Sequence, residues 1–408
     1  MESAYTLFSA LPGQQQKRAW AEIDLDALRQ NYRLLRATVT AASPTTRMIA
    51  VVKGEAYGHG YPHCISTLLE EGCDFFAAAT LEEALAVRKI CNAQGHKPNV
   101  LILGYTDPAC APLLSAHALT QALLSPAYAA ALHREAEAAS LCLSVHVAVN
   151  TGMNRIGFAV RNEAEVEATA REILSLAANS RWKIDGIFTH FARADEENDP
   201  DAVSLTDLQM QRFRALRTRL EPTLSVPLWH ACNSAAALTR PADHLDAVRL
   251  GILLFGSSPL EVPRIPLRPV MKLKTLVAHL HRLLPGEAVG YGGEYVATEE
   301  RLLATLPIGY ADGLPRAATG ARVTVHTRSG PRSAPLVGRI CMDQCMIDVT
   351  DLGADLGNEV TVFGEDPRAL ATLSRHVGSI DHELLCGISP RVPRIYLDSR
   401  NPKFTSKE

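Results

Sequence analysis

The chain has 408 residues, of which 47% are hydrophobic and 21% are charged, and its net charge is -3. This length allows two or three domains with sizeable cores, and the nearly balanced charge argues against a surface for nucleic acid or membrane. The first residues lack a cationic start followed by an apolar run, so we expect no signal peptide. No apolar run approaches the roughly 20 residues that a membrane span needs.

Nine cysteines are scattered along the chain, an odd number without close pairs. This pattern argues against a disulfide framework and favours reduced thiols in the cytoplasm. Cys341 and Cys345 could be two metal ligands, but no second pair follows at structural-zinc spacing. We therefore expect a cytoplasmic protein without a metal site.

Short aliphatic or β-branched runs alternate with longer amphipathic segments from about Trp20 to Gly256. The segments Leu81–Ile90, Pro126–Ala139 and Asn162–Ala178 repeat apolar residues at three and four positions, as helices packed on a sheet do. Alternating strand and helix predicts parallel β structure, and eight units favour a closed (β/α)8 barrel over a doubly wound open sheet. The eight runs are Met48–Lys53, Phe75–Ala79, Val100–Leu103, Leu119–Leu124, Leu143–Val149, Ile184–His190, Val226–His230 and Asp246–Leu250.

The pattern changes after about Pro269, where short strand-like segments follow one another with turn signals between them. This predicts a separate, mostly β domain. The segment Leu260–Pro269 is rich in proline, so the expected domains are residues 12–262 for the barrel and 263–400 for the β domain. The strand-like segments are Leu273–Leu283, Glu300–Ile308, Arg322–Thr327, Ala334–Arg339, Cys345–Val349 and Glu359–Phe363.

Barrel enzymes place their chemistry at the carboxyl ends of the strands, and the first run ends in Lys53. A lysine that closes an apolar strand is partly desolvated, which lowers its pKa and allows a Schiff base with an aldehyde cofactor. The alternative is a solvated lysine at a strand end. Tyr57, Gly58, His59 and Gly60 in the same loop favour the functional interpretation.

Polar residues also stand at four later strand ends. Arg155 could hold a carboxylate or a phenolic oxygen, or it could lie on a helix surface. Ser234, with the backbone N–H groups of Gly251 and Ile252, could bind a phosphate, which barrels commonly hold at the last βα loop. The other polar residues at these ends are His190, His230, Asn233 and Arg249.

From about Ala19 to Tyr396 the chain resembles alanine racemases, enzymes with a pyridoxal-phosphate barrel and a second, β domain. The resemblance is specific because it combines nine short motifs. They are Val51–Gly60 (VVKGEAYGHG), Thr151–Phe158 (TGMNRIGF), Thr189–Ala192 (THFA), Asn233-Ser234, Arg249–Gly251, Gly290–Gly292 (GYG), Gly309–Gly313 (GYADG), Gly338–Met346 (GRICMDQCM) and Arg391–Tyr396 (RVPRIY).

The resemblance implies an isomerase that interconverts L- and D-alanine with pyridoxal 5'-phosphate. It implies that Lys53 holds the cofactor as an imine and that Tyr291, supplied across the interface of a homodimer, is the opposing base. Arg249 would face the pyridine nitrogen, with His190 and His230 orienting Tyr291 and Arg249. The implied cofactor contacts are Lys53, Tyr57, Arg155, His190, Asn233, Ser234, Arg249, Gly251, Ile252 and His382, and the implied substrate contacts are Arg155, Tyr310, Met342 and Asp343.

Racemisation removes the α-proton from one face and returns a proton to the other, which two bases on opposite faces achieve directly. Arginine stays protonated and can only donate, so Arg249 would keep the ring nitrogen unprotonated. A tyrosine with an ordinary pKa near ~10 is a weak base at neutral pH. His190 and Arg249 could lower the pKa of Tyr291.

Four positions depart from the family pattern. Ala148 and Asn150 stand where the family usually has lysine and aspartate, which leaves the support of Arg155 open. His382 replaces a tyrosine that lines the substrate pocket, and Arg193 replaces a small residue near the entrance. The related membrane-linked serine racemases also lack that tyrosine. Serine or a broader range of amino acids is therefore an alternative substrate, and a catalytically impaired cofactor-binding homologue is another alternative.

Two other pyridoxal-phosphate families share parts of this architecture. Basic amino-acid decarboxylases place a carboxylate against the ring nitrogen, where this chain has Arg249. Cofactor-homeostasis proteins are single barrels without a second domain. We therefore expect an amino-acid substrate, no nucleic-acid or membrane partner, and a role in D-alanine supply for peptidoglycan precursors, with catabolism as the alternative.

Overall fold

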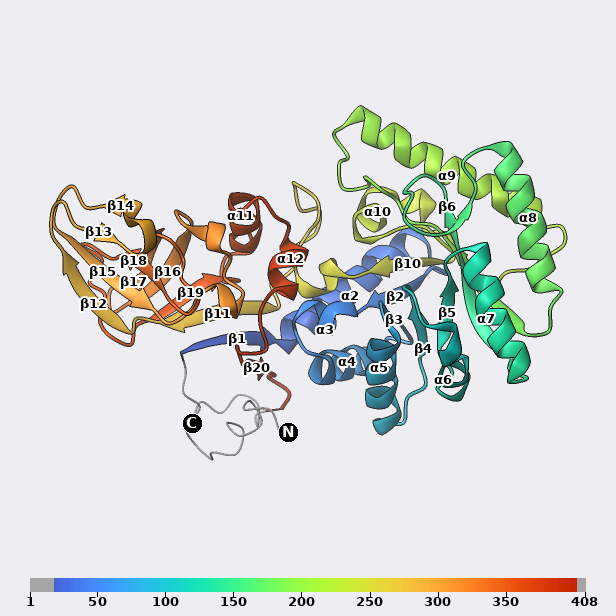
Figure 1. Cartoon of the computed structure of the whole chain (residues 1–408), viewed down its shortest axis with the longest axis horizontal. Coiled ribbons are helices and arrows are strands. Elements are labelled where there is room, and N and C mark those ends of the chain that lie inside the picture. The colour runs from blue at the N-terminus through green and yellow to red at the C-terminus, as the bar shows by residue number, and fades with distance from the viewer. Residues whose placement is uncertain (1–17, 402–408) are drawn as a thin grey trace.

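The computed structural model describes residues 18–401, and two domains lie side by side along its long axis (Figure 1). The first is a closed barrel of eight parallel strands in the order β5-β4-β3-β2-β10-β9-β8-β6, which the pairing of β5 with β6 closes. This confirms the predicted (β/α)8 barrel and excludes the open sheet. The strands are β2 (Arg47–Val51), β3 (Phe75–Ala78), β4 (Asn99–Ile102), β5 (Thr120–Leu123), β6 (Leu143–Asn150), β8 (Trp182–Phe188), β9 (Leu228–His230) and β10 (Ala247–Leu250).

Helices cover the outside of the barrel, and most of them begin at side-chain caps. Ser125 accepts a hydrogen bond from the backbone N–H of Tyr128, and Asn162 accepts one from that of Glu165, so α7 and α8 start where the sequence predicts. The helices are α2 (Leu25–Ala42), α4 (Tyr61–Glu70), α5 (Leu81–Ala93), α6 (Ala111–Ala116), α7 (Pro126–Ala138), α8 (Glu163–Ala177), α9 (Pro200–Leu220) and α10 (Ser234–Thr239).

The second domain is built on a nine-stranded sheet in the order β12-β15-β18-β17-β16-β19-β11-β1-β20. It confirms the predicted β domain, but the expected segment Leu273–Leu283 forms two strands, β11 and β12, which pair with different neighbours. Two helices, α11 (Ala369–His376) and α12 (Asp381–Cys386), lie on the side that faces the barrel (Figure 1). The strands after β10 are β11 (Met271–Leu276), β12 (His279–Leu283), β13 (Ala288–Val289), β14 (Tyr295–Val296), β15 (Arg301–Leu306), β16 (Arg322–Thr327), β17 (Gly330–Val337), β18 (Cys345–Asp348), β19 (Glu359–Phe363) and β20 (Arg394–Leu397).

The strand β1 (Ala19–Asp24) precedes the barrel in sequence but belongs to the sheet of the second domain. It pairs antiparallel with β11 and parallel with β20. The expected barrel region, residues 12–262, includes this strand, whereas its hydrogen bonds lie in the other sheet; residues 12–17 are outside the described part. The chain therefore crosses between the two domains more than once.

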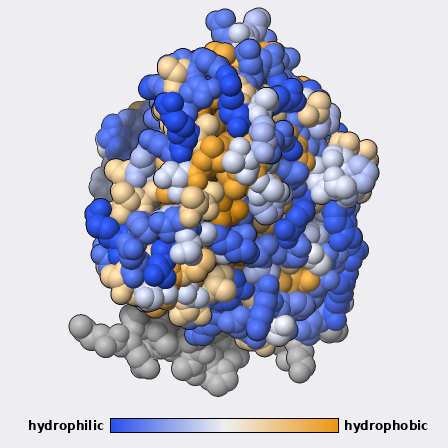
Figure 2. Space-filling view, turned by 90° about the vertical axis from the view of Figure 1, so that its right-hand side faces the viewer, coloured by the Kyte–Doolittle hydropathy of each residue, from blue (hydrophilic) through white to orange (hydrophobic). Residues whose placement is uncertain are grey.

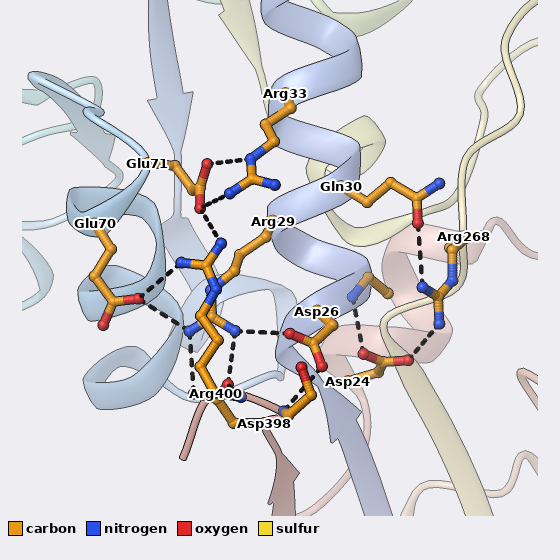
Figure 3. Close-up of polar contacts among 12 residues, drawn as sticks. Asp24, Asp26, Arg29, Gln30, Arg33, Glu70, Glu71, Arg268, Asp398 and Arg400 are labelled. Atoms are coloured by element: carbon orange, nitrogen blue, oxygen red, sulfur yellow. Dashed lines mark hydrogen bonds and ion pairs between the residues drawn. The ribbon is translucent and has the colours of Figure 1, made fainter.

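A charged network ties the end of the chain to the barrel (Figure 3). The guanidinium of Arg29, on α2, is only 3% exposed and donates to both carboxylate oxygens of Asp398, at 2.8 and 3.0 Å, and to Glu70 at 3.0 Å. Beside it, Arg33 pairs with Glu71 at the end of α4. Helices α2 and α4 and the segment after β20 are thus held together by buried or half-buried ion pairs.

The outer face of the barrel end is mainly hydrophilic, with a strip of hydrophobic residues near its middle (Figure 2). Amphipathic helices explain most of this pattern, because α8 turns residues such as Val166 and Ile173 inward. Within residues 18–401, no helix combines the length and the apolar composition that crossing a membrane requires.

Candidate active site

A cavity of about 470 Å³ lies where the carboxyl ends of the barrel strands meet. Ile252 is buried and does not line it. Nine of the ten expected cofactor residues do line it: Lys53, Tyr57, Arg155, His190, Asn233, Ser234, Arg249, Gly251 and His382. The structure thus brings together residues that are more than 300 positions apart in the chain.

The four residues after Lys53 form one turn of left-handed helix. Their φ angles are 63° at Gly54, 55° at Glu55 and Ala56, and 54° at Tyr57. For residues that carry a Cβ, this conformation costs roughly 1–2 kcal/mol each. The turn lets Lys53 point into the cavity while Tyr57 packs under it, so the strain sits where the chemistry is expected.

Side chains from the barrel hold this turn in place. Glu83, on α5, accepts hydrogen bonds of 2.7 Å from the backbone N–H of Gly54 and of 2.7 Å from that of Ala79. The hydroxyl of Tyr61 accepts a longer one, 3.3 Å, from the N–H of Glu55. The bonds from Gly54 and Glu55 satisfy backbone donors of the turn, and the bond from Ala79 ties Glu83 to the end of β3.

The second domain also reaches this loop. Arg394 on β20 donates from Nε to the carbonyl of Gly58 at 3.0 Å, and the hydroxyl of Tyr396 donates to the carbonyl of His59 at 3.0 Å. A Cβ at Gly60 would lie 2.1 Å from the Tyr396 hydroxyl oxygen, so only glycine fits there. The lysine loop is therefore clamped between both domains.

The amine of Lys53 is electrostatically disfavoured as a cation. The protein around it desolvates the ammonium and lowers its pKa, and the positive charge of Arg155 lowers it further, while Cys386 and Glu83 oppose the shift. Arg155 lines the same cavity and, in the part of the chain that is described, has no ion-pair or hydrogen-bond partner. The lowered pKa makes the nucleophilic amine of Lys53 easier to form than that of a free lysine, beside the positive charge of Arg155.

Arg249, at the end of β10, is held by acceptors on two sides. Its Nη2 donates to the carbonyls of Thr189 at 2.7 Å and Ala231 at 2.8 Å. Its Nη1 lies 2.6 Å from Nδ1 of His230, and its Nη2 lies 3.1 Å from Nδ1 of His190. Burial lowers the pKa of Arg249 to about 10, so it is still a cation at neutral pH.

These contacts occupy both Nη atoms of Arg249. Among the residues described, none accepts from its Nε–H, and Arg249 lines the cavity. Burial lowers the pKa of His190 and of His230 well below the ordinary value, so both rings are neutral and accept from the guanidinium through Nδ1. Arg249 thus has one N–H left for a ligand.

The opposite side of the cavity is built from small groups. A Cβ at Gly251 would lie 2.2 Å from the hydroxyl oxygen of Tyr57. Any residue with a side chain would clash there, so this close approach of backbone and ring requires glycine. The backbone N–H of Gly251 donates to the hydroxyl of Ser234 at 3.1 Å. Since this hydroxyl accepts from Gly251, its own proton is available to an anion in the cavity.

Two family models match the chain: "alanine racemase, N-terminal domain" over residues 23–259 and "alanine racemase, C-terminal domain" over residues 270–396. The chain belongs to the alanine racemase family. Alanine racemase 1 of Clostridium acetobutylicum is 37% identical and is matched over 93% of this chain and 95% of its own length. The alanine racemase of Desulfovibrio desulfuricans is 38% identical, over 93% and 98%. A solved alanine racemase from a D-cycloserine-producing Streptomyces lavendulae is 30% identical, over 96% of this chain and 100% of that one, with a TM-score of 0.84.

Two departures from the alanine racemase pattern lie at the end of β6. Ala148 packs in an apolar cluster with Ala122 and Phe188, so no charged group takes the place of the usual lysine there. Asn150 accepts hydrogen bonds from the backbone N–H groups of residues 152 and 154, at 3.1 and 3.0 Å, and so shapes the following loop. Support of the neighbouring arginine by this position, which the family pattern implies, is absent from the described residues.

The other two departures have separate surroundings. His382, on α12, lines the cavity with its ring 5.8 Å from that of Tyr57, and burial lowers its pKa. Arg193 does not line the cavity; it pairs with Glu196 and, at 2.6 Å, with Asp199 at the start of α9. Asp195, which the sequence analysis did not single out, lines the cavity instead.

Four expected site residues of this family member do not reach the cavity within one chain. Tyr291, Tyr310 and Met342 are 69%, 44% and 53% exposed, and Asp343 pairs with Arg391 at 2.7 Å. Tyr291 lies between β13 and β14, at the end of the molecule farthest from the barrel (Figure 1). A single chain therefore presents Lys53 without Tyr291. Within residues 18–401, no group of three or more His, Cys, Asp or Glu side chains is placed to hold a metal ion.

Proposed function

We propose that the protein is an alanine racemase that interconverts L- and D-alanine, with pyridoxal 5'-phosphate bound at Lys53. The observation that carries this proposal is the pairing of Lys53 with Arg249 in one cavity, with the Nε–H of Arg249 left without a protein acceptor among the described residues. A permanently protonated donor at the ring nitrogen suits racemisation. A decarboxylase of this architecture would present a carboxylate there.

The residues of the cavity fit this cofactor. The cation at Arg155 suits its phenolic oxygen, and the hydroxyl of Ser234 has a free proton for its phosphate. Because Gly251 has no Cβ, the hydroxyl of Tyr57 can lie against its backbone on the same side of the cavity as Ser234. When bound, pyridoxal phosphate supplies an electron sink for negative charge at the substrate's α-carbon.

The protein's own part is to move one proton on each face of the substrate. Lys53, whose pKa is lowered, accepts or returns the α-proton on one face. Tyr291 of a second subunit is proposed for the other face. Because His190 accepts from Arg249 through Nδ1, its Nε2 carries a proton and can donate to the phenolic oxygen of that tyrosine.

Purified protein should show the cofactor's absorbance and racemise alanine in both directions, measured by circular dichroism. Lys53→Ala should lose both the absorbance of the bound cofactor and the activity. A parent protein that binds the cofactor but leaves both enantiomers of alanine unchanged would contradict the proposal and would favour the impaired-homologue alternative.

The exposed Tyr291, Tyr310 and Met342 support a homodimer with shared sites. Mixed dimers test this directly. Lys53→Ala and Tyr291→Phe are each expected to be inactive, but in a mixed dimer one site receives Lys53 from one subunit and Tyr291 from the other. Random mixing should restore about one quarter of the parent activity, since about half the dimers are mixed and each has one intact site. No recovery would place both groups in the same subunit.

Serine is the second candidate substrate, because His382 offers a neutral imidazole at the cavity wall where it could bond to a hydroxyl. A panel of L- and D-alanine and L- and D-serine decides between the two. His382→Tyr should then lower kcat/KM for serine more than for alanine. The nine free cysteines support a reducing compartment, and we propose a cytoplasmic location.

A further inference from the structure

The hydrogen bonds of Arg249 continue past the active site into the bore of the barrel. Nδ1 of His230 lies 2.6 Å from Nη1 of Arg249, and Nε2 of His230 lies 2.9 Å from Nδ1 of His146 on β6. Both rings are buried, with His230 0% and His146 1% exposed. Three side chains on three different strands therefore form one chain of contacts across the barrel.

The direction of each hydrogen bond follows from the chemistry of the groups. A guanidinium can only donate, so Nδ1 of His230 accepts. Burial keeps His230 neutral by lowering its pKa, so its single proton is on Nε2 and is donated to Nδ1 of His146. Burial likewise lowers the pKa of His146 to about 3, so this ring is a neutral acceptor whose own proton is on Nε2.

The barrel is shaped to hold the ring of His146. A Cβ at Gly186, on the neighbouring strand β8, would lie 2.6 Å from Cε1 and from Nδ1 of His146. The pairing of β6 with β8 shifts register between Val145 and His146, a bulge of the kind that re-aims side chains near active sites. Phe188 stacks on His230, with ring centroids 5.1 Å apart. These features fix where both imidazoles lie.

The far end of the chain of contacts opens into a second cavity. This cavity of about 310 Å³ lies at the amino ends of the strands and is lined by His146 together with Arg47, Asn99, Lys183 and Asp185. Most of its lining residues are polar, and it is large enough for water. The Nε2–H of His146 can therefore be satisfied there, which leaves Nδ1 free to serve His230.

We propose that His146 is a positioning residue: by accepting from His230 it holds that ring in the Nε2–H form, which keeps Nδ1 as an acceptor for Arg249 and the Nε–H of Arg249 available to the ligand. In the other tautomer, His230 would present an N–H to the guanidinium, and two donors would face each other. The identity of the ligand rests on the proposed function, but the tautomer of His230 does not.

Three variants separate hydrogen bonding from packing. His146→Asn keeps an acceptor oxygen near the position of Nδ1, whereas His146→Leu removes it. Gly186→Ala leaves every hydrogen-bonding group in place but occupies the space of the ring. His244→Leu is the matched control, because His244 is 1% exposed and bonds to Ala237 rather than to the Arg249 chain.

The first readout is the ¹⁵N NMR signal of the His230 ring in cofactor-free protein, which reports its tautomer without catalysis. The others are the dissociation constant of pyridoxal phosphate, from absorbance, and kcat and KM for alanine. His146→Leu and Gly186→Ala should move His230 toward the Nδ1–H form, weaken cofactor binding, and lower kcat/KM about 10- to 100-fold, mainly through kcat. His146→Asn should stay within about threefold of the parent, and the control should leave the tautomer unchanged.

An unchanged tautomer in both His146→Leu and Gly186→Ala would overturn the inference, and if the leucine variant does not fold, Gly186→Ala decides alone. A shifted tautomer in a protein whose parent form does not racemise alanine would support the role of His146 and refute the proposed function. A lowered kcat/KM with the parent tautomer would mean that His146 acts through packing, which also overturns the inference.

Discussion

The carboxylate of Glu83 accepts a hydrogen bond of 2.7 Å from the backbone N–H of Gly54, the residue directly after Lys53. Its other oxygen accepts from the N–H of Ala79, which follows β3, also at 2.7 Å. One side chain on α5 therefore fastens the left-handed turn to the neighbouring strand. The position of Lys53 depends on a residue that does not itself line the cavity.

Glu83→Gln should weaken this attachment, because an amide has one acceptor oxygen and its NH2 group would face a backbone donor. We expect the free energy of unfolding to fall by about 1–3 kcal/mol and kcat for alanine to fall roughly tenfold. Urea unfolding and a racemisation assay measure the two effects. Glu82→Gln, an exposed change on the same helix turn, is the control; equal effects of both changes would refute the role of Glu83.

Gly251→Ala tests whether Tyr57 and residue 251 compete for one space. The added methyl group would lie 2.2 Å from the Tyr57 hydroxyl, and the ring is buried and cannot move aside. We expect pyridoxal phosphate to bind about tenfold more weakly. The double variant with Tyr57→Phe removes the shortest contact and leaves the ring carbon Cζ at 2.9 Å, so only part of the affinity should return. Additive losses in a dissociation-constant cycle would show that the two positions are independent.

The stability of the protein should fall as the pH falls through the range of histidine. His59 is 0% exposed, and burial lowers its pKa to about 4 from an ordinary 6.5. Between these values the unfolded chain binds a proton that the folded protein does not, so the contribution is complete above pH 6.5 and is lost as the pH approaches 4. The loss from His59 is about 3 kcal/mol by pH 4.

Urea unfolding at pH 7, 6 and 5 measures this slope before carboxylates begin to titrate. His59→Asn, which can still donate to the carbonyl of Ala56, should show a shallower slope than the parent. The other buried histidines of the barrel shift in the same direction and remain in the variant. A slope that is identical in both proteins would mean that His59 is protonated in the folded state.

Much of the fold can be predicted from the sequence, because the periodicities of strands and helices are local features. All eight barrel strands and the change to β structure after Pro269 follow from them. The sequence pattern does not predict the split of residues 273–283 into β11 and β12, because both halves have the same apolar pattern. It does not predict the place of β1 in the second sheet either, because the partners of β1, β11 and β20, lie about 250 and 370 residues away in the chain.

The candidate site also contains residues whose roles no local sequence pattern predicts. The sequence indicates Glu83 only as the fourth residue of a capping box that starts at Thr80. In such a box its carboxylate would accept a hydrogen bond from the backbone N–H of Thr80. In the fold it bonds instead to Ala79 and Gly54. His146 stands inside an apolar run that reads as a core strand, and nothing local marks its contact with His230, 84 residues later.

Asp398 connects the domain junction to the lysine loop, and its removal should affect both. It pairs with Arg29, which is 3% exposed, and it follows β20, whose Arg394 and Tyr396 hold the loop after Lys53. Asp398→Asn leaves the guanidinium of Arg29 buried with part of its neutralising charge missing. We expect the free energy of unfolding to fall by about 3 kcal/mol.

The control is Glu70→Gln, since Glu70 also pairs with Arg29 but is half exposed, and its loss should cost about 1 kcal/mol or less. Asp398→Asn should also speed amide hydrogen exchange in the loop at residues 58–60, because β20 supplies two of the bonds that close it. Faster exchange confined to the segment after β20 would mean that the ion pair fastens the chain end without supporting the site.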